Sequence, residues 1–128
     1  MTCATSVLLL EDEPLILMDL ELAAEELGCE CLAACSSPEA LALLGQAGRL
    51  PEVAVLDFTL QHGDTCQGVA AELRRLGIPY ILHSGDLGRE DEHTCDLDAL
   101  LVPKPANPHH VIACALGLIE DERLRASG

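Results

Sequence analysis

Four apolar runs of this chain each end in residues whose side chains can do chemistry. The side chains at these ends are carboxylates, a hydroxyl and an amine: Glu11 with Asp12, Asp57, Ser84 and Lys104. Lys104 is also the only lysine in the chain. Carboxylates that bind a cation, together with a compact positive charge, are groups that support phosphoryl transfer. The sequence therefore predicts a phosphoryl-transfer site, assembled where the predicted strands end.

Three of these side chains are carboxylates that are expected to converge. Ligands of open parallel sheets bind at the carboxyl ends of the strands, and a central first strand puts Glu11 and Asp12 beside Asp57. Crowded carboxylates repel each other, and a hard divalent cation removes that conflict. Mg²⁺ fits best because it takes one or two carboxylates, keeps several waters and can share an oxygen with a phosphoryl group. We predict a Mg²⁺ site whose fourth protein ligand is the backbone carbonyl of Thr59, in the loop after Asp57.

The remaining groups are assigned by their chemistry. Asp57 is the expected nucleophile, since a carboxylate can form an acyl phosphate and this one ends the most deeply buried predicted strand. Lys104 is expected to neutralise charge on the transferring phosphoryl group. Ser84 is expected to donate a hydrogen bond to a phosphoryl oxygen.

Strand and helix patterns alternate along the whole chain. Apolar runs predict strands near 6–11, 29–35, 52–57, 79–84 and 99–103. Between them, helical patterns with start and stop signals fall near 14–27, 37–47, 65–76 and 107–124, with a weaker one near 89–97. We therefore predict a three-layer α/β fold with one parallel sheet that is covered by helices on both faces.

Length and composition set the class of protein. The 128 residues predict a single domain over 1–128, with its core from about residue 6 to residue 124. The hydrophobic content of 49% excludes a disordered acidic tail, and the formal charge of −15 argues against direct binding of nucleic acid or an anionic membrane. The sequence contains neither a membrane-spanning run nor a signal-peptide pattern, so a cytoplasmic protein is expected.

The chain has seven cysteines and five histidines. No Cys-x-x-Cys pair occurs, and Cys29 and Cys31 fall on one face of a predicted strand, so the cysteines are interpreted as small hydrophobic residues. A redox or metal role for them has no support in the sequence. Four histidines are expected to be exposed polar residues: His62, His93, His109 and His110. His83 lies inside a predicted strand, where burial is expected.

The first predicted helix carries two apolar stripes. One stripe is spaced to face the sheet: Ile16, Leu20, Ala23 and Leu27. A second stripe lies on another side of the helix: Leu15, Met18 and Leu22. The second stripe is interpreted either as part of a wide core face or as an exposed patch that docks a partner.

The acidic pair Glu11-Asp12, Asp57, Ser84 and the dipeptide Lys104-Pro105 together make the chain similar to a response-regulator receiver domain of two-component signalling. The resemblance covers the chain from about Val7 to Leu124. It implies a flavodoxin-like, five-stranded parallel sheet of order 2-1-3-4-5 wrapped by five helices. It also implies Mg²⁺-dependent transfer of a phosphoryl group to Asp57 from a histidine kinase or a phosphotransfer protein, which docks on the first helix.

The same resemblance assigns further positions and shows departures from the family pattern. Thr59 and Asp86 match the variable positions that tune the lifetime of the phosphoryl group. The family commonly has proline, an aromatic switch residue and phenylalanine where this chain has Gln61, Leu101 and Ala106. These departures leave the phosphorylation chemistry in place and predict an output that does not use the family's aromatic switch.

Three functions compete at this point. The leading hypothesis is a stand-alone phosphoacceptor that signals by contact with an unidentified downstream protein and is no enzyme beyond its own phosphorylation and dephosphorylation. The alternative is a receiver-like interaction module that works without phosphorylation. A phosphatase with an aspartyl-phosphate intermediate is disfavoured, because that class carries Asp-x-Asp after its first strand. The sequence leaves dimerisation open.

Overall fold

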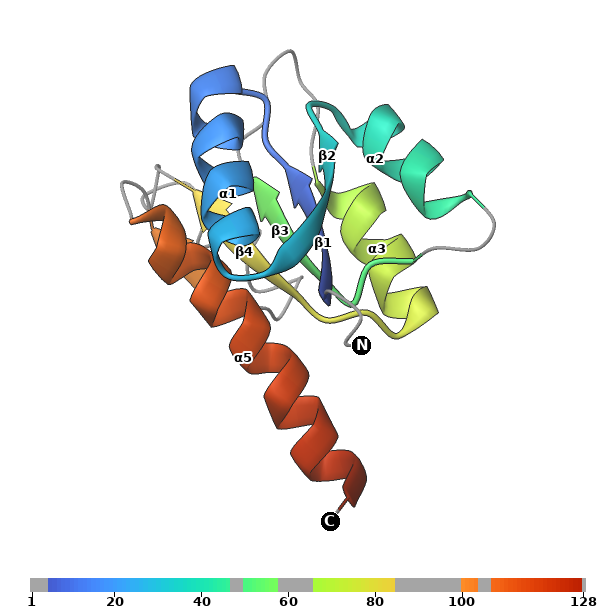
Figure 1. The fold of residues 1–128 in the computed structure, drawn as a ribbon. Helices are drawn as coiled ribbons and strands as arrows, with labels where there is room; N and C mark the ends of the chain where they lie inside the picture. Colours follow the sequence, from blue (N-terminus) through green and yellow to red (C-terminus); the bar gives the residue numbers. More distant parts are fainter. Residues whose placement is uncertain (1–4, 47–49, 58–65, 85–99, 104–106, 128) are drawn as a thin grey trace.

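Five parallel strands form the centre of the protein (Figure 1). The computed structural model describes residues 5–46, 50–57, 66–84, 100–103 and 107–127. The strands pair in the order β2-β1-β3-β4-β5. Their bounds are Thr5–Leu10 for β1, Cys29–Ala34 for β2, Val53–Asp57 for β3, Tyr80–Ser84 for β4 and Leu100–Pro103 for β5. The predicted α/β class with a parallel sheet is confirmed.

Four helices lie in the described part of the chain. Each comes directly after a strand, in a region where the sequence predicted a helix. Their bounds are Pro14–Glu26 for α1, Ser37–Leu44 for α2, Gln67–Leu76 for α3 and Pro108–Ser127 for α5. The helix predicted near 89–97 lies outside the described residues. The helix predicted over 37–47 is shorter than expected, because Gly45 caps it after Leu44.

In the part of the chain that the structure describes, two helices pack on each face of the sheet. Alternate side chains of a strand point to opposite faces, so β1 sends Leu8 and Leu10 to one side and Val7 and Leu9 to the other. The first side packs against α2 and α3, through residues that include Ala40, Leu44, Val69 and Leu73. The second side packs against α1 and α5, through residues that include Leu20, Ala23, Val111 and Ile112. Burial on both faces explains why these strands are continuous apolar runs.

Local signals fix where the helices begin and end. The Ser36 hydroxyl accepts a hydrogen bond from the Glu39 backbone N–H at 3.3 Å, which satisfies one of the free N–H groups at the start of α2. The Glu39 carboxylate in turn accepts a bond from the Cys35 N–H at 3.1 Å. At the end of α3, Gly77 adopts φ +76° and the Ile78 N–H reaches the Leu73 carbonyl at 2.9 Å, as in a Schellman cap.

The two apolar stripes of α1 have different environments. Leu20 and Ala23 of the first stripe are buried against the sheet, as predicted. The inclusion of Leu27 in that stripe is wrong: α1 ends at Glu26, and the Leu27 side chain is 43% exposed. Leu27 is the C-cap residue, one position past the helix, and it lies outside the buried cluster to which Leu20 and Ala23 belong.

The described cysteines are thiols, none of them in a disulfide, and they lie in different environments. Cys29 and Cys66 are buried and Cys31 is half-buried, which agrees with their interpretation as small hydrophobic residues, whereas Cys35 is exposed. Burial raises the pKa of the Cys31 thiol to about 11, and the negative charges of Glu21 and Glu25 add to the effect. A thiol with such a pKa stays protonated, and therefore poorly nucleophilic, near neutral pH.

The rate of alkylation tests the raised pKa of the Cys31 thiol directly. We expect Cys31 to react with iodoacetamide far more slowly than the exposed Cys35 at pH 8, because a pKa of about 11 leaves roughly 100-fold less thiolate than an ordinary thiol has. Its rate should rise steeply as the pH increases toward 11. Peptide mass spectrometry of the native protein measures both sites in one sample. Equal rates for Cys31 and Cys35 would contradict the raised pKa.

Candidate functional site

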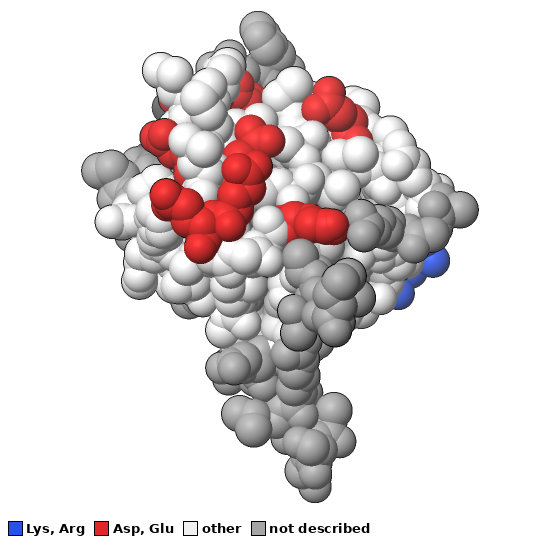
Figure 2. All heavy atoms as spheres, in the orientation of Figure 1, with Lys and Arg blue, Asp and Glu red and all other residues white. Residues whose placement is uncertain are grey.

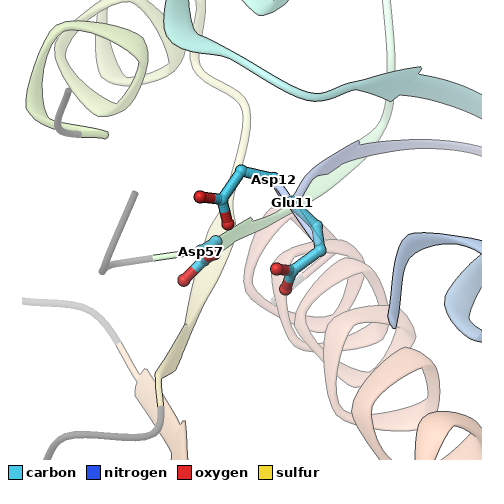
Figure 3. Close-up of side chains that lie close together, drawn as sticks. All are labelled: Glu11, Asp12 and Asp57. Atoms are coloured by element: carbon cyan, nitrogen blue, oxygen red, sulfur yellow. The ribbon is translucent and has the colours of Figure 1, made fainter. Parts of the chain in front are cut away.

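Glu11, Asp12 and Asp57 form a carboxylate cluster at one edge of the sheet (Figure 3). β1 and β3 are adjacent, and their register pairs Leu10 with Leu56, so the next residues, Glu11 after β1 and Asp57 at the end of β3, fall at the same edge. One oxygen from each of the three carboxylates lies within 4.8 Å of the others. Glu11 and Asp57 are 1% exposed, and Asp12 is half-buried. The convergence of these carboxylates, which the sequence predicted, is present in the structure.

The cluster is held by the backbone on both sides of Glu11. The Glu11 N–H donates to the Ala34 carbonyl at 3.0 Å, which continues the ladder between β1 and β2 by one residue. The Glu13 N–H donates to the Glu11 carboxylate at 3.2 Å. Glu13 is the N-cap of α1, so the carboxylate of Glu11 lies at the positive end of that helix dipole, which favours its charge.

The donor set of the carboxylate cluster fits Mg²⁺. All three side chains offer oxygen, the ligand atom that hard cations prefer. Oxygens bound to one octahedral Mg²⁺ at 2.0–2.1 Å lie about 2.9 Å apart when adjacent and about 4.2 Å apart when opposite. In the structure, the three carboxylate oxygens lie within 4.8 Å of one another, which is close to that range. Small side-chain adjustments would therefore bring them into coordination. A divalent cation would also offset negative charge that two nearly fully buried residues place there.

The other predicted site residues are only partly covered by the structure. Ser84 is the last residue of β4, which pairs with β5 so that Ser84 is opposite Pro103. This backbone position lies at the same edge as Asp57, because Asp57 pairs with His83, the residue before Ser84. The Ser84 hydroxyl lies outside what the structure describes. So do Lys104, which directly follows β5, and the two positions predicted to tune phosphoryl lifetime, Thr59 and Asp86.

His83 is a buried polar residue next to the carboxylate cluster. It is 4% exposed, and it pairs with Asp57 across β3 and β4. Paired residues of neighbouring strands point to the same face of a sheet, so the imidazole and the Asp57 carboxylate share a face. The sequence signal was its place inside an apolar run, which predicted burial but gave no indication of this pairing.

The second stripe of α1 is an exposed apolar patch. The side chains of Leu15, Met18 and Leu22 are 74%, 53% and 53% exposed, so the interpretation as part of a wide core face is wrong. The physical reason is that the first stripe already fills the contact with the sheet. Large apolar side chains that stand together on a surface are typical of a binding site.

The described surface is strongly acidic. Figure 2 shows Asp and Glu side chains gathered over the α1 and β2 side of the molecule, in keeping with the net charge of −15. Glu21 and Glu25 belong to this side, since both carboxylates act on the Cys31 thiol of β2. Among the described helices, none combines the length and apolar character needed to cross a bilayer.

Comparison with known proteins gives a consistent answer on the fold. No protein-family model matches the chain, and neither does any curated protein sequence. Among solved structures, a CheY-like response regulator receiver domain protein from Methanospirillum hungatei has a TM-score of 0.81 at 19% identity, covering 96% of this chain and 99% of that one. A response regulator receiver protein from Sinorhizobium medicae has a TM-score of 0.79 at 23% identity, covering 91% and 95%.

A third solved structure is more similar in sequence. The response regulator PhyR from Brucella abortus is 34% identical, with a TM-score of 0.74 over 97% of this chain. The chain spans about half of that protein, 52% of its length. The matches cover nearly the whole chain and agree with its parallel sheet. The chain therefore has the fold of the response-regulator receiver domains.

Proposed function

We propose that this protein is a phosphoacceptor of a two-component phosphorelay, which takes a phosphoryl group onto Asp57 with the help of Mg²⁺. The observation that carries the proposal is the carboxylate cluster of Glu11, Asp12 and Asp57 at the carboxyl edge of a receiver fold. Such crowding of buried acids is costly for a fold unless a cation offsets it. A structural role alone gives no reason to keep three acids there.

Each residue has a stated part in the proposed reaction. A carboxylate oxygen of Asp57 attacks phosphorus, the bond between phosphorus and the donor's histidine nitrogen breaks, and an acyl phosphate results. When bound, Mg²⁺ offsets negative charge on the phosphoryl oxygens and on the carboxylates. Glu11 and Asp12 would hold the ion together with Asp57 and the Thr59 carbonyl. Ser84 and Lys104 would bind the oxygens of the transferred group from the ends of β4 and β5.

The donor in this proposal is a histidine kinase or a histidine phosphotransfer protein. It would dock on the exposed patch of Leu15, Met18 and Leu22. This patch lies on α1, the helix that begins three residues after Glu11. Exposed apolar side chains contribute to such an interface by burial on binding. The output would be contact with a downstream protein, and the acidic surface makes nucleic acid an unfavourable direct target.

Phosphorylation by a small donor tests the proposal without knowledge of the kinase. The wild-type protein, incubated with acetyl phosphate and Mg²⁺, should gain one phosphoryl group by intact mass spectrometry. Asp57→Asn should gain none, since an amide cannot form the acyl phosphate. Omitting Mg²⁺ or adding a chelator should also prevent the gain. An unmodified wild-type protein under these conditions would overturn the proposal.

A matched variant separates chemistry from docking. Leu15→Ala removes the most exposed residue of the α1 patch and leaves the carboxylate cluster unchanged. We expect it to accept phosphoryl from acetyl phosphate at the wild-type rate, because a small donor needs no docking surface. A rate reduced as far as in Asp57→Asn would contradict the separate roles of patch and cluster.

The alternative function is an interaction module that works without phosphorylation. Leu101 favours it, because this residue of β5 replaces the aromatic switch of the family and pairs with Leu82 at the centre of β4. The acetyl phosphate experiment decides between the two functions. Beryllofluoride with Mg²⁺ gives a second test: changed amide spectra in the wild type, but not in Asp57→Asn, support the phosphoacceptor.

A further inference from the structure

A histidine and a cysteine lie side by side on α5. His110 Nε2 and Cys114 Sγ are 3.6 Å apart, and the two residues are four positions apart in the sequence. Residues at this spacing share one side of a helix. His110 is exposed and Cys114 half-exposed, whereas the neighbouring Val111, Ile112 and Ala115 are buried against the sheet. His110 therefore faces solvent, and Cys114 lies at the boundary, partly packed against the core that α5 forms with the sheet.

The distance between the two atoms matches the separation of a nitrogen and a sulfur that bind the same metal ion. In a tetrahedral zinc site, with Zn–N of 2.0–2.1 Å and Zn–S of 2.3 Å, nitrogen and sulfur are about 3.6 Å apart. The same separation is already present between His110 and Cys114. A cation could then meet both atoms at ordinary bond lengths with little movement, so little side-chain conformational entropy would be lost on binding.

We propose that His110 Nε2 and Cys114 Sγ chelate one borderline-soft divalent cation such as Zn²⁺, with water in the remaining coordination positions. Two ligands one turn apart on a helix are the arrangement by which helices bind zinc in other proteins. The thiol releases its proton as the metal–sulfur bond forms, and imidazole binds in its neutral form. This site is independent of the proposed phosphorylation.

The two cation sites differ in chemistry. Imidazole and thiolate suit Zn²⁺ and Co²⁺, whereas Mg²⁺ takes oxygen ligands. Saturating Mg²⁺ should therefore occupy the carboxylate cluster and leave His110 and Cys114 available. The net charge of −15 raises the local concentration of cations around the protein and so favours binding at both places.

Cobalt absorption reports the proposed thiolate ligand. The full chain, reduced and saturated with Mg²⁺, is titrated with Co²⁺, and the near-ultraviolet charge-transfer band of a cobalt–thiolate bond is recorded. We expect a band in the wild type that Zn²⁺ removes by competition. Cys114→Ser should abolish the band, and His110→Ala should weaken Co²⁺ binding about 10-fold or more. Absence of the band in the wild type would overturn the proposal.

Two other described residues provide matched controls. Cys35 is an exposed thiol whose Sγ lies 3.8 Å from a Glu39 oxygen, and His109 contacts Glu26 of α1. Cys35→Ser and His109→Ala should both keep the wild-type band and affinity. A band that disappears in Cys35→Ser and survives in Cys114→Ser would overturn the assignment.

Protection from alkylation gives a second readout. Zn²⁺ should slow the reaction of Cys114 with iodoacetamide several-fold, since a metal-bound thiolate is a poorer nucleophile, and should leave Cys35 unaffected. His110→Ala should remove the protection. Equal rates for Cys114 with and without Zn²⁺ would count against the chelate, whatever the outcome of phosphorylation at Asp57.

Discussion

Replacing Asp12 by Asn is expected to weaken Mg²⁺ binding by more than about 10-fold, a loss of about 1.4 kcal/mol or more in binding free energy. The same change is expected to stabilise the metal-free protein. Unit charges about 5 Å apart repel by about 3 kcal/mol at an effective dielectric constant of about 20, and solvent around the half-buried Asp12 screens part of this, so we expect a gain of about 1 kcal/mol.

The two effects of Asp12→Asn have opposite signs, which makes the test specific. Titration calorimetry measures Mg²⁺ binding, and urea denaturation in the presence of a chelator measures the free energy of unfolding. Asp19→Asn is the matched control, because Asp19 is exposed on α1 and lies outside the carboxylate cluster. It should change neither quantity appreciably. A destabilised metal-free Asp12→Asn protein would show that the cluster carries no net repulsion.

Truncating Leu56 to Ala is expected to lower the free energy of unfolding by about 2–5 kcal/mol. Leu56 is fully buried in β3, the strand that ends in Asp57, and it belongs to the core under α2 and α3. Removing its side-chain carbons loses their transfer free energy and leaves a cavity that the packed neighbours fill only in part. The loss is a large fraction of the total stability of a domain of this size.

Leu41→Ala is the control for Leu56→Ala. Leu41 is 40% exposed on α2, and alanine is a favourable helix residue, so we expect a change of less than about 1 kcal/mol. Urea denaturation of both variants gives the comparison. Similar losses for the two would contradict the assignment of Leu56 to the core.

The carboxylate cluster illustrates how much the sequence could predict. Its three residues follow apolar runs, and parallel strands put their carboxyl ends at one edge, so the type of site follows from pattern and topology. The sequence could not give the separations of the oxygens or the hydrogen bond from the Glu13 N–H to Glu11. Those depend on where the chain turns into α1, and hence on the packing of that helix.

The two stripes of α1 show the limit of periodicity. Helical spacing placed Leu20 and Ala23 on the sheet, yet it gave no means of deciding between core and surface for Leu15, Met18 and Leu22. Packing decided this, because the sheet can contact only one side of the helix. Leu27 was assigned wrongly for a related reason: the helix ends one residue earlier than its apolar pattern.

By itself, the sequence determined the order of strands and helices, the α/β class and the identity of the acids at the strand ends, because each depends on residues close together in the chain. Only the tertiary structure decided which side chains meet. The pairing of Asp57 with His83 and the exposure of the α1 patch depend on strand register and helix rotation. These are set by packing between segments that are far apart in sequence, and a local pattern carries no record of them.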